Sequence, residues 1–292
     1  MVNLYNYIIE NRLFRKLKAD DLLFAEYKCL VEEERGEVWS HTNYFAFGLS
    51  GKKLWQTING KYLVQPGKLL FVKKGANAVY QYFDDEFLAL IIFIPDDFIK
   101  NVIAKHNLDL QKVKQNKNPD SIIPIKTDEV LDSYFHSILS YFAKEKSISK
   151  SLLKLKIEEL LVSLATNQND PFLNNCFKEI YESNKISIKE IMEENYCNSL
   201  TLEEYAKLSA RSLSTFKRDF AGVYNTTPGK WLTEKRLGHS RYLMQNTNKS
   251  IEEIFNECGF SNRSHFIKVF KNRYGTTPIK FKSSRQPLRK VI

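Results

Sequence analysis

The sequence predicts an α+β protein of more than one domain: an antiparallel β-barrel of the jelly-roll type with trailing helices, then an all-α domain with two helix-turn-helix motifs. Three observations predict this fold class. Short apolar runs separated by turn residues fill the first third of the 292 residues, a helical phrase occurs twice near the C-terminus, and positive charge is concentrated around that phrase. At this length two domains are more usual than one.

The first third has the pattern of short strands. Between about residues 20 and 95 the chain contains runs such as "NYFAFGLSG", "KLWQTING" and "FLALIIFI", with Asn-Gly and Pro-Gly turns. Runs of this length and spacing are typical of antiparallel strands in a barrel. Eight aromatic residues either fill the barrel core or line an apolar pocket for a ligand: Trp39, Phe45, Phe47, Trp55, Tyr62, Phe71, Tyr80 and Phe83.

Two amphipathic helices are expected after the barrel, at about 127–166. "DEVLDSYFHSILSYFA" and "SKSLLKLKIEELLVSLATN" each place apolar residues at i, i+3 and i+4. This apolar stripe either packs on the barrel or forms a dimer interface between two chains. In the second helix it contains Leu152, Leu155, Leu160, Leu161 and Leu164.

A break in the helical pattern separates the two domains. "NQNDPFLNN" interrupts the helices, and a linker is expected over about 167–184. The next segment, "SIKEIMEENYCNS" at 187–199, is typical of a helix that directs Ile188, Ile191 and Met192 inward. We expect it to be the first helix of the second domain.

The repeat in the last third begins with two capping boxes, "TLEE" and "SIEE". In each, the hydroxyl bonds the N3 amide and the glutamate reaches back to the cap amide. A short helix follows, Leu202 to about Leu208 and Ile251 to about Glu257, and after a tight break a second helix opens at Ser212 or near Asn262. Helix, tight turn, helix is the helix-turn-helix arrangement.

The second helix of each copy carries the repeated phrase, "FKRDFAGVYNTTP" at 216–228 and "FIKVFKNRYGTTP" at 266–278. Both phrases end in Thr-Thr-Pro, a threonine cap followed by proline at the first helical position, which starts a new helix. The first such helix, "PGKWLTEKRLGHSRYLMQ", is expected to pack against both copies and to be roughly 25 Å long. The inward faces of the second helices are Phe216, Phe220 and Val223 or Tyr224, then Phe266, Phe270 and Tyr274.

The charge distribution points to a polyanion partner for the second domain. Residues 201–292 contain 18 Lys and Arg against 7 Asp and Glu, whereas the first 200 residues contain 26 against 27. The outward positions of the second helices carry hydroxyls and basic groups, which suit the base edges and phosphates of double-stranded DNA. A connecting helix of this length lets both enter adjacent major grooves, about 34 Å apart. The expected contacts are Ser214, Thr215, Lys217, Arg218, Arg263, Ser264, His265, Lys268 and Lys271.

The sequence does not indicate an enzyme. Metal-dependent barrel enzymes need two or three histidines and a carboxylate, and the barrel region has one histidine, His41. There is no Gly-x-Ser-x-Gly elbow, phosphate-binding glycine loop or His-Glu-x-x-His helix. No cofactor or metal is therefore expected. The four cysteines fit reduced thiols better than disulfides or a zinc site: Cys29, Cys176, Cys197 and Cys258.

A cytoplasmic protein without a membrane partner is expected. No apolar run approaches the roughly 20 residues that cross a bilayer. The first residues, "MVNLYNYIIENRLFRK", also lack a basic leader followed by an apolar stretch.

Residues 200–282 resemble the DNA-binding domain of the AraC/XylS family of bacterial transcription regulators. The resemblance is carried by "LTLEEYAKLSARSLSTFKRDF", "TTPGKWLTEKRL", "SIEEIFNECGFSNRSHFIKVFK" and "YGTTPIKF". Two departures are Phe255, where the family usually has alanine, and Ala210, at the usual glycine of the first turn. The resemblance implies that bases are read by Ser214, Lys217 and Arg218 in one copy and by Arg263, Ser264, His265 and Lys268 in the other.

The first domain is similar to the cupin-like sensor domain of many family members. "PGKLLFVKKG" and "LLKLKIEELLVSLA" resemble the subgroup that includes activators of type III secretion genes, which are controlled by a partner protein. The expected domains are 1–166, a cupin-like sensor or regulatory domain with dimerisation helices at about 127–166; 167–184, a linker; 185–284, the DNA-binding domain; and 285–292, a basic C-terminal tail.

Together, the residues and the resemblance predict a sequence-specific transcription regulator, an activator, controlled through its first domain by a small-molecule or protein effector. The expected partners are double-stranded DNA, RNA polymerase for an activator, and a second copy of the chain. Two alternatives from other classes stay open. One is a cupin-type metal-dependent enzyme fused to a DNA-binding module, and the other is a non-specific architectural DNA-binding protein.

Overall fold

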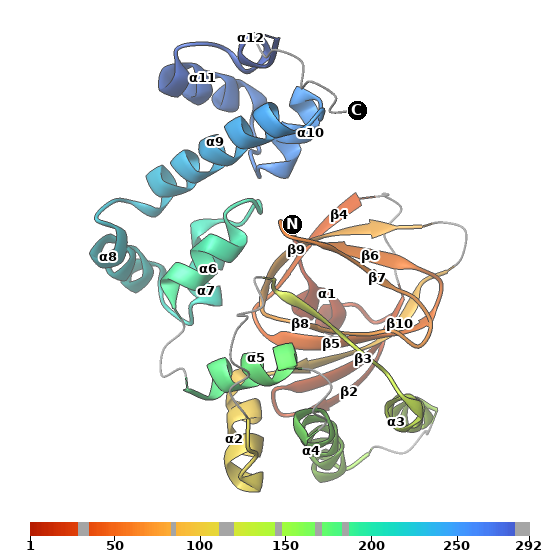
Figure 1. Ribbon diagram of the computed structural model, residues 1–292. Helices are drawn as coiled ribbons and strands as arrows, with labels where there is room; N and C mark the ends of the chain where they lie inside the picture. Colours follow the sequence, from red (N-terminus) through yellow and green to blue (C-terminus); the bar gives the residue numbers. More distant parts are fainter. Residues whose placement is uncertain are drawn as a thin grey trace. The chain divides into compact units, whose positions relative to one another are not determined.

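The computed structural model describes residues 1–28, 35–82, 86–110, 120–143, 148–166, 171–182 and 187–283. The chain divides into two units, Met1–Ile186 and Ser187–Ile292 (Figure 1). Some parts of the sequence predictions lie outside the described residues: Cys29, Phe83, residues 167–170 and 183–184 of the expected linker, and the basic tail 285–292.

The first unit is built on two β-sheets. Strands follow the order β1-β4-β9-β6-β7 in one sheet and β11-β8-β5-β10-β3-β2 in the other. The pairings are antiparallel, apart from the parallel pairing of β1 with β4. The strands are β1 (Val2–Asn3), β2 (Arg15–Ala19), β3 (Leu22–Lys28), β4 (Arg35–Ser40), β5 (Asn43–Ser50), β6 (Lys53–Gln56), β7 (Lys61–Val64), β8 (Leu69–Val72), β9 (Gly75–Gln81), β10 (Leu88–Ile94) and β11 (Ile122–Ile125).

The prediction of an antiparallel, jelly-roll type of β domain is confirmed, and the barrel is not closed. A closed barrel requires every strand to pair with two neighbours. Among the described residues, β1 and β7 are the outer strands of one sheet, and β11 and β2 of the other. The two sheets instead share a hydrophobic layer, to which Tyr44 and Ile91 contribute from the larger sheet and Trp55 and Val79 from the smaller one. The first unit is therefore a two-sheet sandwich.

The six-stranded sheet is buried on both faces. In β10, Leu90 and Ile92 belong to the cluster beneath the helices, while Ile91 and Phe93 belong to the layer between the sheets. Successive side chains of a strand point to opposite faces. A strand covered on both sides is apolar throughout rather than alternating, which explains the continuous run "FLALIIFI".

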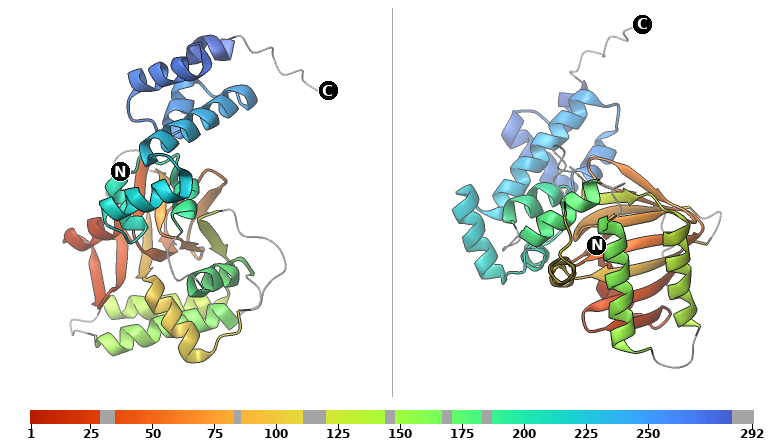
Figure 2. Two further views of the ribbon diagram at one scale, coloured as in Figure 1. Left: turned by 90° about the vertical axis from the view of Figure 1, so that its left-hand side faces the viewer. Right: turned by 60° about the horizontal axis from the view of Figure 1, so that its bottom comes forward.

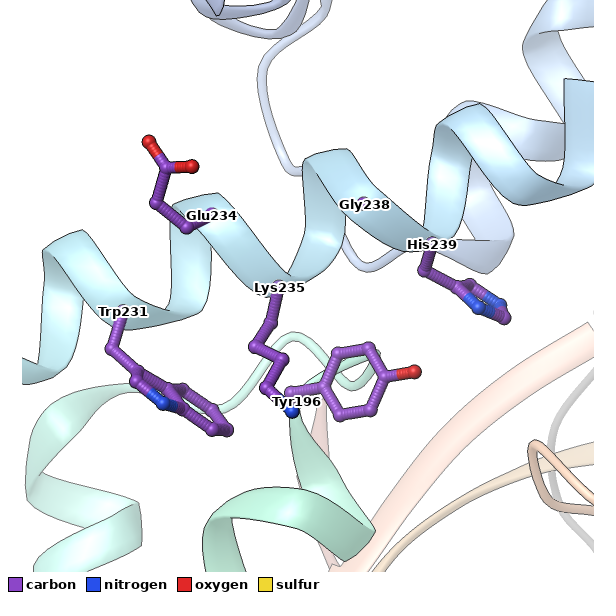
Figure 3. Close-up of a pocket in the computed structure, with 6 residues that line it drawn as sticks. All are labelled: Tyr196, Trp231, Glu234, Lys235, Gly238 and His239. Carbon is purple, nitrogen blue, oxygen red and sulfur yellow. The ribbon is translucent and has the colours of Figure 1, made fainter. Parts of the chain in front are cut away.

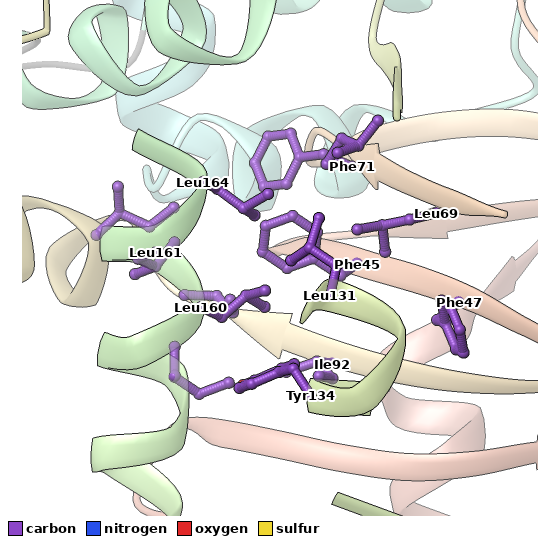
Figure 4. Close-up of a cluster of buried hydrophobic side chains, with 14 of the residues drawn as sticks. Phe45, Phe47, Leu69, Phe71, Ile92, Leu131, Tyr134, Leu160, Leu161 and Leu164 are labelled. Atoms are coloured by element: carbon purple, nitrogen blue, oxygen red, sulfur yellow. The ribbon is translucent and has the colours of Figure 1, made fainter. Parts of the chain in front are cut away.

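Four helices cover the outer face of the six-stranded sheet (Figures 1 and 2). Phe47 of β5 stacks on Phe135 of α3 with ring centroids 4.4 Å apart, and Phe71 of β8 meets Phe177 of α5 edge to face at 5.7 Å. Each buried aromatic ring of this kind stabilises the unit by about 2–3 kcal/mol. Figure 4 shows Leu164 of α4 beside Phe45 and Phe71 of the sheet. The helices are α2 (Asp96–His106), α3 (Glu129–Phe142), α4 (Lys150–Thr166) and α5 (Pro171–Glu182). A short helix, α1 (Leu4–Glu10), packs Leu4 and Ile8 into the layer between the sheets.

Part of the segment predicted as a linker, 167–184, belongs to the first unit. Pro171–Glu182 forms helix α5, and its Leu173, Cys176 and Phe177 are buried in the core. Pro171, which lies within the stretch "NQNDPFLNN", is the first residue of this helix, a position where proline is favoured.

Of the eight aromatic residues expected either to fill the barrel core or to line an apolar pocket, four lie in two different clusters of buried side chains. Phe45, Phe47 and Phe71 lie in the cluster beneath the helices, whereas Trp55 lies between the sheets, where its Nε1 donates to the Tyr44 hydroxyl at 3.1 Å. They therefore fill two separate cores.

The stripe predicted on α4 is partly wrong. Leu160, Leu161 and Leu164 are buried, but Leu152 and Leu155 are 37% and 55% exposed. The buried face continues instead through Leu153 and Ile157, which pack into the cluster beneath the helices. Apolar residues lie on more than one side of this helix, so the spacing alone does not select the buried side.

The second unit is helical and contains both predicted helix-turn-helix motifs. They are α7–α8 and α10–α11, with α9 between them (Figure 1). The helices of the described residues are α6 (Ile188–Asn195), α7 (Leu202–Leu208), α8 (Leu213–Tyr224), α9 (Pro228–Asn246), α10 (Ile251–Glu257), α11 (Arg263–Tyr274) and α12 (Pro278–Ser283).

The predicted helix starts are confirmed. Both capping boxes are complete: Glu204 N donates to Thr201 Oγ1 at 3.2 Å while Thr201 N donates back to Glu204 at 2.8 Å, and Ser250 repeats this pattern. Ser212 and Asn262 cap α8 and α11. Ile188, Ile191 and Met192 are buried as expected, although α6 ends at Asn195, earlier than predicted.

Candidate nucleic-acid interface

The two second helices, α8 and α11, have the same length and the same buried face. Each has 12 residues, and Phe216 and Phe220 in α8 are buried like Phe266 and Phe270 in α11. The two helices are therefore in register at an offset of 50 residues. Val223, one of the two inward candidates, is 55% exposed, so Tyr224 is the residue that packs inward, against Phe220 at 4.7 Å.

The outward ridge of α8 follows from this register. At 100° per residue, the positions opposite Phe216 and Phe220 are 214, 215, 218, 221 and 222. Arg218 lies at the centre, and its side chain is 78% exposed. Ala221 and Gly222 leave the C-terminal half of the ridge bare, and a Cβ added to Gly222 would meet nothing within 4 Å.

The equivalent ridge of α11 is polar along its whole length. All of its members are exposed: Ser264, His265, Lys268, Lys271 and Asn272. Serine recurs at the first position and a basic residue at the central one, since Lys268 stands where α8 has Arg218. The structure thus presents two matched ridges of hydrogen-bond donors, the second longer than the first.

Two of the residues expected from the sequence lie on the flanks of these ridges. Lys217 is exposed beside the buried face, at the position that Ile267 occupies in α11. Arg263 is the first residue of α11, equivalent to Leu213. Asn272 is a ridge residue that the sequence prediction lacks, although the offset of 50 residues between the copies could have identified it.

Hydrogen bonds already engage part of the first ridge. The Ser212 hydroxyl donates to Thr215 Oγ1 at 2.9 Å and lies 3.1 Å from Ser214 Oγ. Asp219 accepts from Arg211 Nε at 3.1 Å and from Arg218 Nε at 3.4 Å. The Arg211 hydrogen bond, with a further contribution from Arg218, lowers the pKa of Asp219.

The turns of the two motifs differ in sequence and in length. Ala210 and Gly259 both have left-handed backbone, with φ of 52° and 71°. The second turn is one residue longer, because α7 and α10 correspond at an offset of 49 and α8 and α11 at an offset of 50. A Cβ on Gly259 would lie 2.3 Å from the carbonyl oxygen of Cys197, so only glycine fits there. Ala210, in contrast, is exposed to solvent.

Helix α9 connects the two motifs. Its 19 residues give a length of about 28 Å. Near one end Trp231 meets Phe220 of the first motif at 6.1 Å, and near the other Leu243 and Met244 share a core with Ile254, Phe266 and Phe270. The prediction that this helix packs against both copies is confirmed (Figure 1).

A shallow groove runs along α9 beside the end of α6. It has a volume of about 420 Å³ and is lined by Tyr196, Trp231, Glu234, Lys235, Gly238 and His239 (Figure 3). Lys235 Nζ lies 5.1 Å from the Trp231 ring and bonds both carboxylate oxygens of Glu193 at 2.8 Å. Burial lowers the pKa of His239.

His41, the one histidine of the sandwich region, is surrounded by rings and an amide. Its ring lies 4.9 Å from Tyr5 and 6.3 Å from Trp39, and its Nδ1 lies 3.4 Å from Asn3 Nδ2. In the described ranges, no group of three or more His, Cys, Asp or Glu is arranged to hold a metal ion. None of the helices in the described part of the chain combines the length and apolarity needed to span a membrane.

Comparison with known proteins gives matches in both units. The model of the ExsA N-terminal regulatory domain matches residues 43–175, and a helix-turn-helix domain model matches residues 205–284. The virulence regulon transcriptional activator VirF of Yersinia enterocolitica is 28% identical over 232 residues, which cover 79% of this chain and 85% of that protein. The HTH-type transcriptional regulator ExsA of Pseudomonas aeruginosa is 28% identical over 244 residues, which cover 82% and 86%.

Among solved structures, an apo form of ToxT from Vibrio cholerae has a TM-score of 0.45 and 13% identity, over 92% of this chain and 100% of that chain. The relatives extend over both units, and the second family model falls on the repeated motif whose geometry is described above. The chain belongs to the AraC/XylS family of DNA-binding transcription regulators.

Proposed function

We propose that this protein is a sequence-specific transcription activator that places α8 and α11 in adjacent major grooves on one face of a DNA duplex. One observation carries the proposal: two helices in register, each with an exposed donor-rich ridge, are attached near opposite ends of the same 19-residue helix. Two major-groove segments on one face of B-DNA lie about 34 Å apart, a distance comparable with the length of α9.

Some of the ridge residues would contact base edges and others would contact phosphates. Arg218 and Lys268, at the ridge centres, would contact base edges, with Ser214, Thr215, Ser264, His265 and Asn272 beside them. Lys217, Arg263 and Lys271 would contact phosphates or neighbouring bases. Neutralising phosphates supplies much of the affinity, so binding should weaken steeply as the salt concentration rises.

Activation implies RNA polymerase as a partner. Two of the relatives bear the name of virulence regulon transcriptional activator, which supports an activating role for this chain. By the same similarity, its targets would include genes of the type III secretion class, and its place of action would be the cytoplasm.

The first unit would receive the signal. Its match to a regulatory-domain model over residues 43–175 supports control by an effector, either a small molecule or a protein. Catalysis is not part of the proposal, and neither is a cofactor.

A homodimer would form through α4. Leu152 and Leu155 are exposed on this helix although the remainder of its leucines face the sheet. Exposed leucines one turn apart fit a helix–helix contact between two chains.

The decisive experiment is to map the DNA fragments bound by the protein in its native host and to measure affinity for a recovered site against random-sequence duplex. A specific regulator should prefer its own site by about 10³-fold or more. Equal affinity for both duplexes would instead identify a non-specific architectural protein. Stoichiometric iron, zinc or manganese in the purified protein would support the metal-enzyme alternative.

A further inference from the structure

We infer that the segment Glu193–Asn198, held by Arg236, is a brace that fixes the second helix-turn-helix motif relative to the first and thereby sets the spacing between the two DNA sub-sites. This inference rests on the proposed function, because it concerns how the two recognition helices are placed. Arg236 is the central positioning residue.

The brace is attached to the first motif and to α9. The Tyr205 hydroxyl of α7 donates to the Asn195 carbonyl at 2.7 Å, and Tyr205 is buried against Phe216 of α8. Glu193 pairs with Lys235 of α9 at 2.8 Å. One end of the brace is thus part of the first motif.

Arg236 holds the other end. Its Nε donates to the Tyr196 carbonyl at 2.6 Å and its Nη2 donates to the Asn198 carbonyl at 2.8 Å. These carbonyls belong to the peptides immediately before and after the Cys197–Asn198 peptide, so a single guanidinium restrains that peptide from both sides. A planar guanidinium suits this arrangement because its donors have a fixed geometry.

The oriented Cys197 peptide lies directly against the turn of the second motif. A Cβ on Gly259 would come within 2.3 Å of the Cys197 oxygen and 2.6 Å of its carbonyl carbon. Cys197 and Cys258 are both buried at this contact. Backbone therefore meets backbone here, without a flexible side chain in between.

Two attachments between the motifs, α9 and the brace, restrict motions of the second motif that a single attachment would allow. A single helix between two small bodies permits bending and twisting about its axis, whereas a second contact beside it removes those motions. One inserted base pair moves the next groove segment by about 3.4 Å and rotates it by about 34°. A braced pair of recognition helices cannot follow that displacement, and an unbraced pair can.

The test selects bound sequences from a random duplex library with the full-length protein and with Arg236→Met and Arg236→Lys. The wild type should enrich two sub-sites at one fixed spacing. Arg236→Met, which removes both hydrogen bonds, should enrich several spacings, and Arg236→Lys should be intermediate. On two duplexes that differ by one base pair inserted between the sub-sites, the wild type should prefer the shorter by about 10-fold or more, and this ratio should fall to about 3-fold or less in Arg236→Met.

Ile254→Val is the matched control, because it weakens the buried core of the second motif without touching the brace. It should bind less tightly to both duplexes and retain the wild-type ratio. A ratio unchanged in both Arg236 variants would overturn the inference while leaving the proposed function intact. Enrichment of no sequence by the wild type would instead overturn the proposed function, and with it the inference.

Discussion

Arg218, at the centre of the outward ridge of α8, is paired with its neighbour Asp219, whose Oδ1 lies 3.4 Å from the arginine Nε. Asp219 also accepts from Arg211 at 3.1 Å, so one carboxylate restrains two cations. Helix α8 therefore carries a negative charge beside Arg218, the residue that is proposed to contact DNA.

Replacing this carboxylate should strengthen DNA binding and reduce its selectivity. In Asp219→Asn, the repulsion from phosphates is removed and Arg218 loses the partner that orients it. Affinity for random duplex should rise by several-fold, more than affinity for the specific site, and the salt dependence should steepen by about one counterion. Fluorescence anisotropy titrations at several salt concentrations measure all three quantities. A drop in affinity for both duplexes would show that Asp219 is needed to keep α8 in place.

Arg218→Ala and Lys268→Ala should each lower affinity for the specific site by about 1–3 kcal/mol and relax selectivity at one base pair. Arg263→Ala and Lys217→Ala, on the ridge flanks, should lower affinity more evenly across sequences. Competition with single-base variants of the site separates the two patterns. Lys189→Ala, exposed on α6, is the control and should have little effect. An equal loss of affinity on every sequence would show that Arg218 contacts phosphates rather than bases.

Ala210→Gly should stabilise the second unit. Relief of the left-handed strain of alanine should stabilise the folded state by about 1–2 kcal/mol. The larger conformational entropy of glycine in the unfolded chain should oppose this by about 0.4–1 kcal/mol. A gain of about 0.5–1 kcal/mol in the free energy of unfolding is expected from these two terms, measured by denaturant titration of the full chain. Asn225→Gly, at another left-handed position, should gain less because asparagine tolerates this conformation. A loss of stability in Ala210→Gly would contradict the assignment of strain.

The stability of the protein should depend on His239 below neutral pH. Burial lowers the pKa of this imidazole, Lys249 lowers it further, and Glu257 raises it. Between that lowered value and about 6.5 the unfolded chain binds more protons than the folded one, so the free energy of unfolding falls as the pH falls through this interval. His239→Gln should flatten this part of the profile.

Leu155→Lys, alone and with Leu152→Lys, should weaken self-association by about 10-fold or more if α4 forms the proposed dimer. Sedimentation equilibrium of the full chain measures the dissociation constant. Leu13→Lys is a matched control, because Leu13 is 75% exposed and lies outside α4. A dimer unchanged by the α4 substitutions would place the interface elsewhere.

The second unit is predictable from the sequence because its signals are local. Caps, glycines and apolar spacings act within a few residues, and they correctly locate Thr201, Ser212, Ser250 and Asn262 at helix starts. Asn272 is not predicted as a ridge residue when each copy is considered separately. Aligning the two copies on their buried phenylalanines would identify it.

The first unit is less predictable because its fold depends on pairings between distant strands. β1 pairs with β4, and β11 pairs with β8 about fifty residues away. Alternation and turn residues predict the strands but not which of them end a sheet, so a sandwich and a barrel give the same pattern. Pro171 misleads in a similar way, because proline both interrupts and begins helices.

The contact between Gly259 and the Cys197 carbonyl makes the two copies of the repeat unequal partners in any exchange. Glycine in place of Ala210 should be tolerated, since glycine accepts the left-handed backbone of Ala210 and this residue faces water. Alanine in place of Gly259 would instead bring its methyl group against the Cys197 carbonyl. Within the second unit, the turn of the first motif should therefore accept substitutions at Ala210 that the turn of the second motif cannot accept at Gly259.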